Sequence, residues 1–248
     1  MRVLLIVLFI LAGLTPASAA DLKLLTAGAF KPVALELVPE FEKKTGHKVT
    51  VENDTAGGLT RRIAGGEHFD VVVLTPAGLS PLLGNKVVES SVKPLARVGI
   101  GVGIKQGAAK PDISSIEAFK QSLLAARAIA YTDPASGGTA GVYLAKLFEK
   151  MGIADQLRPK TVLVKGGLAG EKIVSGEADI AMQPASEILA VPGVELVGPI
   201  PLEVQTYIIY AGGVSAAARD QGAADALLAA LHGPDKAALL KKKGMELP

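Results

Sequence analysis

The chain has 248 residues, of which 49% are hydrophobic and 20% charged, a composition typical of a globular protein with a sizeable core. It contains no cysteine, which excludes disulfides, thiolate metal sites and thiol catalysis. The formal net charge of +2 is too small to indicate a nucleic-acid partner. Four Tyr, six Phe and no Trp disfavour sites that stack sugars or bases.

The first residues have the pattern of a secretory signal peptide. Arg2 precedes an apolar run over residues 3–14, and an Ala-x-Ala pattern follows. The run is shorter than the roughly 20 residues that a membrane-spanning helix needs, and no Cys follows it that could carry a lipid. We therefore expect residues 1–19 to be a signal peptide and the mature protein to be periplasmic and not lipid-anchored. The alternative is an N-terminal membrane anchor.

Short apolar runs alternate with helical periodicities along the rest of the chain. In the first half, the pattern predicts strands at 22–26, 48–52, 70–74 and 97–104, and helices at 32–44, 59–64 and 115–126. In the second half, it predicts strands at 128–131, 161–164, 179–182, 195–197 and 205–210, and helices at 139–151, 170–175, 184–190, 216–231 and 235–243. This alternation predicts an α/β protein whose parallel-rich sheets are covered by helices on both faces.

Two extended runs interrupt this regular alternation. Residues 97–104 are strand-like but contain three glycines, which weaken a strand and permit it to bend. A second extended run, 205–210, follows Pro199-Ile200-Pro201. We interpret the two runs as crossover strands between two lobes, residues 20–98 plus 205–248 and residues 99–204. The alternative is a single doubly wound domain.

Four small, polar, glycine-containing turns each precede a predicted helix, at residues 26–31, 55–58, 136–139 and 165–167. The start of a helix has N–H groups without helical partners and the positive end of the helix dipole. Glycine lets a ligand approach these groups closely. Because such turns gather at the carboxyl ends of the strands in an open α/β sheet, we expect them to surround a small anion. The alternative for any single turn is an ordinary loop.

Other motifs point away from common enzyme classes. The sequence has no phosphate-binding loop and no Gly-x-Ser-x-Gly elbow, and its three histidines lie in separate turns without metal-ligand spacing, so we expect no cofactor and no metal. Ser136 is interpreted as an anion-binding hydroxyl and not as a nucleophile. Arg61 lies early in a predicted helix, where it either reaches the ligand or lies in solvent.

Five segments distributed over the chain resemble the periplasmic molybdate-binding protein family. They are Leu24-Leu25-Thr26-Ala27-Gly28, Thr55-Ala56-Gly57-Gly58-Leu59, Asp70-Val71-Val72-Val73-Leu74, residues 133–141 (DPASGGTAG) and residues 175–180 (SGEADI). The resemblance implies the type II periplasmic-binding-protein fold, with two lobes and two crossover strands. It also implies a monomer that captures a small anion for an ATP-binding-cassette (ABC) permease in the inner membrane.

The turns and the resemblance together provide the candidate ligand-binding residues. These are Gly28, Ala29, Phe30, Lys31, Thr55, Ala56, Gly57, Arg61, Thr75, Ser136, Gly137, Gly138, Thr139, Lys165, Gly166 and Gln183, with Gln183 standing where the family often has Tyr.

The sequence departs from the family in its first two turns. Ala29, Phe30, Ala56 and Gly57 stand where the family tends to have serines. Fewer hydroxyls argue against tetrahedral molybdate, Phe30 suggests an apolar flank, and the cations Lys31, Arg61 and Lys165 could meet a carboxylate. We therefore expect a small organic acid as the ligand.

Two alternative functions are compatible with the same fold. The first is a periplasmic isomerase of a tricarboxylic acid such as aconitate, for which Lys165 or Glu171 would be the candidate base. The second is a protein that delivers its ligand to a membrane receptor in place of a permease.

Overall fold

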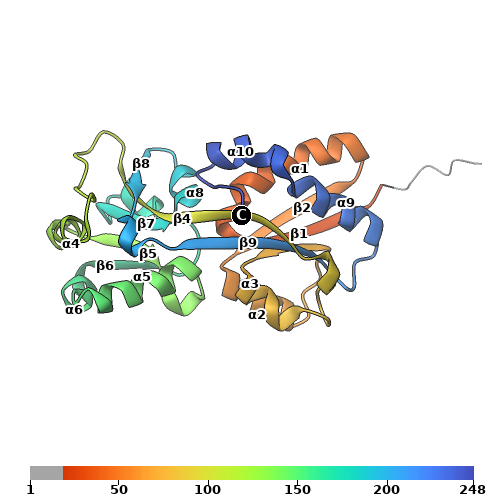
Figure 1. Cartoon of the computed structure of the whole chain (residues 1–248), viewed down its shortest axis with the longest axis horizontal. Coiled ribbons are helices and arrows are strands. Elements are labelled where there is room, and N and C mark those ends of the chain that lie inside the picture. Colours follow the sequence, from red (N-terminus) through yellow and green to blue (C-terminus); the bar gives the residue numbers. More distant parts are fainter. Residues whose placement is uncertain (1–18) are drawn as a thin grey trace, which may run out of the picture.

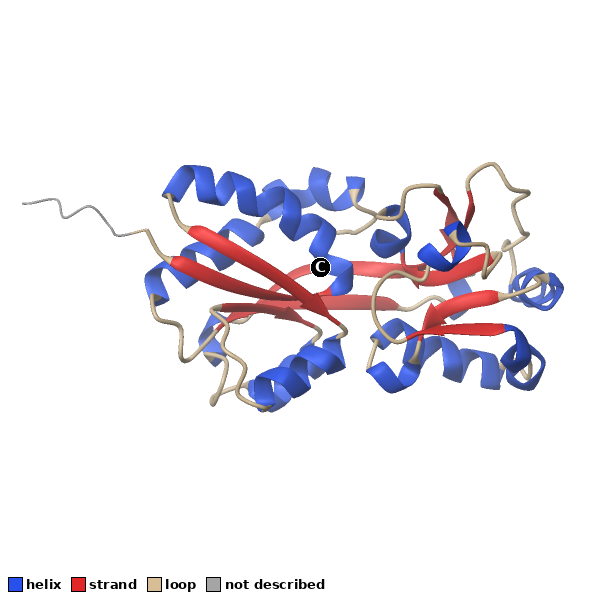
Figure 2. Cartoon of the chain, turned by 180° about the vertical axis from the view of Figure 1, so that it is seen from behind, coloured by secondary structure: helices blue, strands red, loops and turns tan. Residues whose placement is uncertain are grey.

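The structure, a computed structural model, describes residues 19–248, so the predicted signal peptide lies outside the described residues except for Ala19. Two lobes lie side by side along the long axis of the molecule, each with strands in the middle and helices around them (Figures 1 and 2). Within residues 19–248, no helix has both the length and the hydropathy needed to cross a membrane.

The first lobe has a sheet with helices on both faces (Figure 1). Its strands are β1 (Asp21–Ala27), β2 (Lys48–Asp54), β3 (Val71–Leu74), β9 (Tyr207–Val214) and the first half of β4 (Lys93–Lys105). Its helices are α1 (Lys31–Thr45), α2 (Ala56–Ala64), α3 (Pro76–Leu79), α9 (Gln221–Leu231) and α10 (Ala237–Lys242). Strand β1 is parallel to β2 and β3, whereas β3 and β9 are antiparallel. All four side chains of β3 are buried, as expected for an apolar strand covered on both faces.

The second lobe repeats this layered arrangement with a smaller sheet. Its strands are β5 (Ile129–Thr132), β6 (Thr161–Val164), β7 (Ile180–Pro184), β8 (Val194–Pro199) and the second half of β4. Its helices are α4 (Ile116–Ala125), α5 (Thr139–Lys150), α6 (Ala154–Leu157), α7 (Glu171–Val174) and α8 (Ala185–Leu189). Strand β5 is parallel to β6 and β7, whereas β4 is antiparallel to β7 and β8.

Strands β4 and β9 connect the lobes. Strand β4 pairs with β9 as far as Gly99 and with β7 from Ile100 onward. The strand order is β2-β1-β3-β9-β4-β7-β5-β6, with β8 pairing to β4 beside this path. The predicted α/β class with two lobes and two crossover strands is confirmed, and the complete sheet is mixed.

Two of the glycines in β4 allow neighbouring elements to pack closely. A Cβ atom at Gly101 would lie 2.6 Å from Leu196 Cδ1 on β8, and one at Gly103 would lie 2.8 Å from Ile188 Cγ2 on α8. The glycines of this run therefore bring β8 and α8 against β4, which matters because α8 contributes to the candidate site.

Helix ends follow local capping signals. Thr55 caps α2 by accepting a hydrogen bond from the Gly58 N–H, and Asp220 caps α9 in the same way through the Ala223 N–H. Helix α9 consequently begins at Gln221, five residues later than expected from the periodicity at Ala216. The four-residue helix α6 had no predicted counterpart, because one helical turn is too short to show a periodicity.

Candidate functional site

A cavity of about 1060 Å³ lies between the two lobes, at the carboxyl ends of β1, β2, β5 and β7. The first lobe lines it with Ala27, Gly28, Ala29, Lys31, Pro32, Leu35, Glu36, Asn53, Asp54, Thr55, Ala56, Tyr210, Lys242 and Lys243. The second lobe lines it with Thr132, Gly138, Thr139, Ala140, Gly166, Gly167, Leu168, Glu171, Gln183, Pro184, Ser186, Glu187, Leu189 and Ala190. A molecule inside it would contact both lobes.

Three helices of eight or more residues begin at this cavity. The starts of α1, α2 and α5 contribute Lys31, Ala56 and Thr139 to its wall. The first N–H groups of a helix have no partner within the helix, and the helix dipole places partial positive charge there. The cavity therefore has donors from both lobes that suit an anion.

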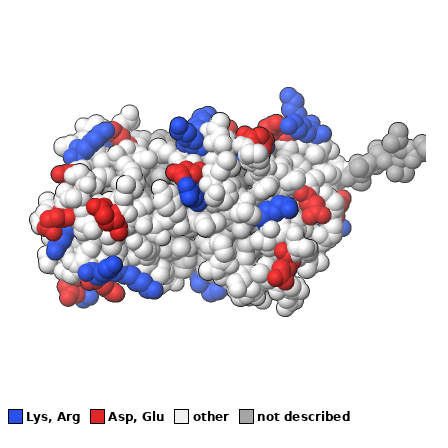
Figure 3. Space-filling view, viewed as in Figure 1, with Lys and Arg blue, Asp and Glu red and all other residues white. Residues whose placement is uncertain are grey.

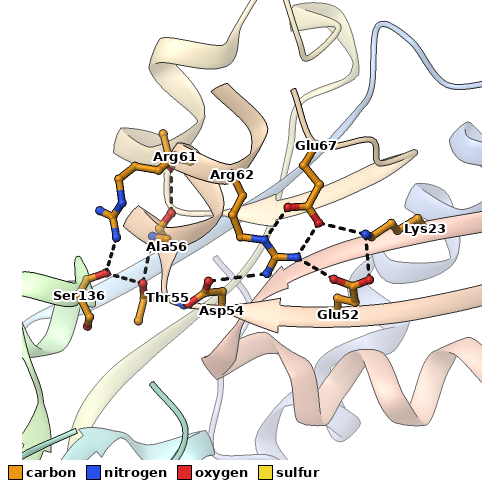
Figure 4. A network of polar contacts seen from close by, with 11 residues as sticks. Lys23, Glu52, Asp54, Thr55, Ala56, Arg61, Arg62, Glu67 and Ser136 are labelled. Carbon is orange, nitrogen blue, oxygen red and sulfur yellow. Dashed lines mark hydrogen bonds and ion pairs between the residues drawn. The ribbon is translucent and has the colours of Figure 1, made fainter. Parts of the chain in front are cut away.

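The lobes contact each other directly beside the cavity. The Gly57 N–H donates a hydrogen bond to the Gly137 carbonyl (3.1 Å), and the Thr55 hydroxyl donates to the Ser136 carbonyl (2.6 Å). Arg61 Nη2 donates to the same Ser136 carbonyl at 3.2 Å (Figure 4). These bonds join the start of α2 to the turn before α5, so the structure shows the lobes in a closed arrangement.

A further contact between the lobes involves α8. The Ser186 hydroxyl, which is buried, donates to the Ala29 carbonyl at 2.8 Å. This bond holds the start of α8 against the turn that follows β1, so the lobes also meet at a second place beside the cavity.

Gln183 supports the loop that forms one wall of the cavity. Its Oε1 accepts a hydrogen bond from the Ala169 N–H at 2.6 Å. Its Nε2 donates to Thr132 Oγ1 at 2.9 Å and to the Gly167 carbonyl at 3.3 Å. Because these bonds occupy the amide, we assign Gln183 a positioning role for residues 166–169.

The sixteen candidate residues divide into two groups. Those that line the cavity are Gly28, Ala29, Lys31, Thr55, Ala56, Gly138, Thr139, Gly166 and Gln183. Those that lie outside its lining are Phe30, Gly57, Arg61, Thr75, Ser136, Gly137 and Lys165.

Each residue outside the lining has an identifiable place. Phe30 is fully buried in the core, and Thr75 caps α3 by accepting from the Gly78 N–H. Gly57, Arg61, Ser136 and Gly137 make the contact between the lobes described above. Lys165 is exposed.

Glu187 on α8 is a site residue that the sequence did not indicate. A Cβ atom on Gly28 would collide with Glu187 Oε1, so this carboxyl group from the second lobe lies directly against the first. Within residues 19–248 it makes no hydrogen bond or ion pair. Burial raises the pKa of Glu187 to about 8. No motif surrounds this residue, and only the packing of α8 places it in the cavity.

Tyr210 on β9 is a second residue that the sequence did not indicate. It is buried, and its pKa is raised by burial and, to a smaller extent, by the charge of Glu187. Its hydroxyl group is therefore neutral at ordinary pH and able to donate or accept a hydrogen bond. Tyr210 and Glu187 line the same cavity from opposite lobes.

Three lysines contribute positive charge to the cavity. Lys31 begins α1, and Lys242 and Lys243 lie at the end of α10. Lys243 Nζ pairs with Glu36 Oε1 at 2.6 Å, whereas Lys31 makes no ion pair within residues 19–248. On the face seen in Figure 3, Lys and Arg side chains are interspersed with Asp and Glu. Among the described residues Lys242 makes no ion pair either, but Lys31 lies in addition at the start of α1, where the helix N–H donors also suit a bound anion.

Arg62 takes part in a network of ion pairs that reaches the cavity wall at Asp54, which it contacts at 3.6 Å. It contacts both carboxylate oxygens of Glu67 at 2.5 Å and Glu52 at 2.7 Å, and Lys23 joins both carboxylates (Figure 4). The hydrogen bonds from Arg62 lower the pKa of Glu67 to about 2. This network ties α2 to β1 and β2 and so steadies one wall of the site. Between residues 19 and 248, no cluster of three or more His, Asp or Glu side chains is arranged to hold a metal ion.

Comparison with known proteins agrees with this geometry. Residues 22–246 match the model of the bacterial extracellular solute-binding protein family. The chain is 34% identical over 248 residues to an aconitate isomerase from Pseudomonas sp., which covers 96% of this chain and 93% of that protein.

Solved structures show the same fold at lower identity. The periplasmic molybdate-binding protein of Azotobacter vinelandii has a TM-score of 0.75 at 21% identity, covering 92% of this chain and 99% of that chain. The sulfate-binding protein of Mycobacterium tuberculosis has a TM-score of 0.72 at 17% identity, covering 92% and 87%. With its two lobes, its cavity between them and a family match along nearly its whole described length, the chain belongs to the bacterial extracellular solute-binding proteins.

Proposed function

We propose that this protein binds a small polycarboxylate anion between its lobes. The observation that carries the proposal is the cavity, whose wall includes the starts of α1 and α2 from one lobe and of α5 from the other. A ligand that accepts hydrogen bonds at several separated points gains most from donors distributed in this way.

The composition of the wall favours an organic acid over a compact oxyanion. Ala29 and Ala56 line the cavity at two of the turns and offer no hydroxyl groups. The volume of about 1060 Å³ is at the upper end of the range for small-molecule sites and exceeds what one tetrahedral oxyanion fills. Lys31 provides a cation for a carboxylate.

Binding is expected to depend on closure of the lobes. A ligand shifts the equilibrium toward the state that it binds better, here the closed state in which both sets of donors reach it. Shifting a population from 1:99 to 99:1 would need a preference of about 5.5 kcal/mol.

Calorimetry with a panel of anions tests the proposal. The panel should contain citrate, tricarballylate, trans-aconitate, succinate, molybdate and sulfate. We expect the tricarboxylates to bind most tightly. If molybdate or sulfate binds and no carboxylate does, the proposed ligand class is wrong; if none binds, the binding function itself is wrong.

The proposal extends to location and partner. The signal-peptide pattern supports a periplasmic protein, and the fold, which is shared with a substrate-binding domain assigned to a molybdenum ABC transporter, supports delivery of the ligand to an ABC permease. Fractionation of cells that express the full chain tests the location. Uptake of the labelled ligand, with and without the protein, tests the transport role.

A second candidate function is the isomerisation of an unsaturated tricarboxylate such as aconitate. Two observations favour it: the relative that is 34% identical is an aconitate isomerase, and the cavity contains Glu187, which has no polar partner in the described part of the chain. Incubation of the protein with cis- or trans-aconitate, followed by proton NMR, distinguishes the two functions. Conversion of one isomer into the other shows catalysis, whereas tight binding without conversion shows a binding protein.

A further inference from the structure

We propose that Glu187 is the acid–base residue that moves the proton during isomerisation of an unsaturated tricarboxylate in the cavity. This inference rests on the second candidate function above and assigns its central step to one side chain.

The position of Glu187 is set by contacts on both sides of the cavity. The neighbouring Ser186 donates its hydrogen bond to the Ala29 carbonyl of the first lobe at 2.8 Å. Glu187 Oε1 lies against Gly28, where a Cβ atom would collide with it. The carboxyl group therefore lies at the boundary between the two lobes in this closed arrangement, which would link proton transfer to the bound state.

The carboxyl group of Glu187 is available to a substrate. Within residues 19–248 it has no hydrogen-bond or ion-pair partner, although it lines the cavity wall. The other titratable groups that line the cavity are Lys31 of α1, Glu36 of α1, Asp54 at the end of β2, Glu171 of α7, Tyr210 of β9 and the lysines Lys242 and Lys243 of the α10 end. Burial and, to a smaller extent, the charge of Glu187 raise the pKa of Tyr210, which lines the same cavity.

The two bases expected from the sequence are less suitable. Lys165 lies outside the cavity lining. Glu171 lines the cavity but is exposed to solvent, so it lacks the burial that tunes a carboxyl group for proton transfer. Glu187 combines access to the cavity with a raised pKa of about 8.

One carboxylate is sufficient for the reaction. It removes a proton from the methylene carbon beside the double bond, and the electron pair of that C–H bond forms a new double bond to the central carbon. The electrons of the former double bond then take a proton from the Glu187 carboxyl group at the far carbon, and this proton is either the one just removed or, after exchange with solvent, a deuteron. The torsion about the bond between the methylene carbon and the central carbon at the moment of abstraction decides whether the new double bond is cis or trans. The reaction consumes no oxidant, reductant or second substrate.

The raised pKa determines the expected pH dependence. Abstraction requires the ionised carboxylate, whose fraction rises as pH rises through about 8. The turnover rate should therefore increase about tenfold per pH unit well below the pKa of Glu187 and level off above it. A bound polyanion would shift this rise to higher pH, because a nearby negative charge favours the neutral carboxyl.

The experiment compares the wild type with the Glu187→Gln variant. Glu203→Gln is the matched control, because Glu203 is exposed and lies outside the cavity lining. Proton NMR in deuterium oxide follows both the conversion of aconitate and the exchange of its methylene protons. We expect Glu187→Gln to lose at least about 100-fold in turnover and exchange, while calorimetry shows affinity for the tricarboxylate within several-fold of the wild type. Glu203→Gln should match the wild type in both measurements.

The outcomes separate the two proposals. A Glu187→Gln variant that isomerises aconitate at the wild-type rate overturns the role of Glu187 and leaves the isomerase function standing. A wild type that binds aconitate without converting it rejects the isomerase function and the role of Glu187 together. If Glu187→Gln does not fold, the wild-type pH profile decides: a turnover rate that stays constant between about pH 6 and pH 9 contradicts the assignment.

Discussion

Gln183 shows how one buried amide can organise a binding wall. It is 1% exposed, and its three hydrogen bonds connect the end of β7 to Thr132 and to the loop of residues 166–169. The side chain thus acts on the ligand through the loop that it holds, and its placement beside the cavity does not by itself make it a ligand-contacting group.

Replacing Gln183 by Met should destabilise the protein by about 1–3 kcal/mol, because buried donors and acceptors lose their partners. Ligand affinity should fall as well, since the Ala169 N–H no longer has an acceptor to hold the loop. Urea denaturation measures the first effect and calorimetry the second. Gln121→Met on the exposed face of α4 is the control and should stay within about 0.5 kcal/mol of the wild type; equal losses in both variants would contradict the positioning role.

Glu67 makes stability depend on pH. Its pKa is about 2 in the folded protein, because Arg62 donates to both of its carboxylate oxygens, and about 4.3 in an unfolded chain. A lowered folded pKa contributes stability above the unfolded pKa, and this contribution is lost as pH falls from about 4.3 toward 2.

We therefore expect Glu67→Gln to be destabilised at pH 7 by about 1–2 kcal/mol after solvent screening. The difference from the wild type should shrink as pH falls below about 4. Thermal unfolding at a series of pH values measures both. Glu203→Gln, which removes an exposed carboxylate outside this network, should show no such convergence; a difference for Glu67→Gln that is constant with pH would show that the ion pair is not the cause.

At the start of helix α2, the Thr55 side chain both caps the helix and bonds to the other lobe. The Thr55 hydroxyl accepts a hydrogen bond from the Gly58 N–H, which caps the helix, and donates one to Ser136 of the other lobe. The capping role follows from the local sequence, because Thr followed by small residues is typical of a helix start. The contact with the other lobe does not, because Ser136 is 81 positions away.

Thr55→Ala should lower the free energy of unfolding by about 1 kcal/mol through loss of the cap, and it should also weaken ligand binding through loss of the bond between the lobes. Ser115→Ala is the matched control, since Ser115 caps α4 through the Ala118 N–H at a site outside the cavity lining. It should lose similar stability and keep full affinity. Denaturation and calorimetry on both variants check this, and an equal loss of affinity in both would refute the role of Thr55 in closure.

At the scale of the whole molecule, closure packs Gly57 of the first lobe against Gly137 of the second lobe. The Gly57 N–H bonds to the Gly137 carbonyl, and a Cβ atom at Gly57 would lie 2.9 Å from the Gly137 Cα. Because the obstructing atoms belong to the backbone of the opposite lobe, they cannot turn away as a side chain could.

Gly57→Ala should therefore disfavour the closed state and weaken ligand binding about tenfold or more. In small-angle X-ray scattering, the variant should need more ligand than the wild type to reach the compact form. Gly222→Ala, near the start of α9, is the control because a Cβ there meets only ordinary contact distances. Unchanged affinity in Gly57→Ala would show that the closed arrangement is not the binding state.

Local patterns in the sequence determined the alternation of strands and helices, the two crossover runs and the glycine turns at helix starts, because periodicity, capping and turn preferences act over a few residues. The glycine turns correctly predicted that Lys31, Thr55 and Thr139 line the cavity. Only the tertiary structure decided that Ser136 and Gly137 face the other lobe and that Glu187 reaches Gly28. Those contacts, like the bond between Ala29 and Ser186, join segments far apart in the sequence, by 81 positions for Thr55 and Ser136 and by 157 for Ala29 and Ser186, and depend on how the two lobes pack.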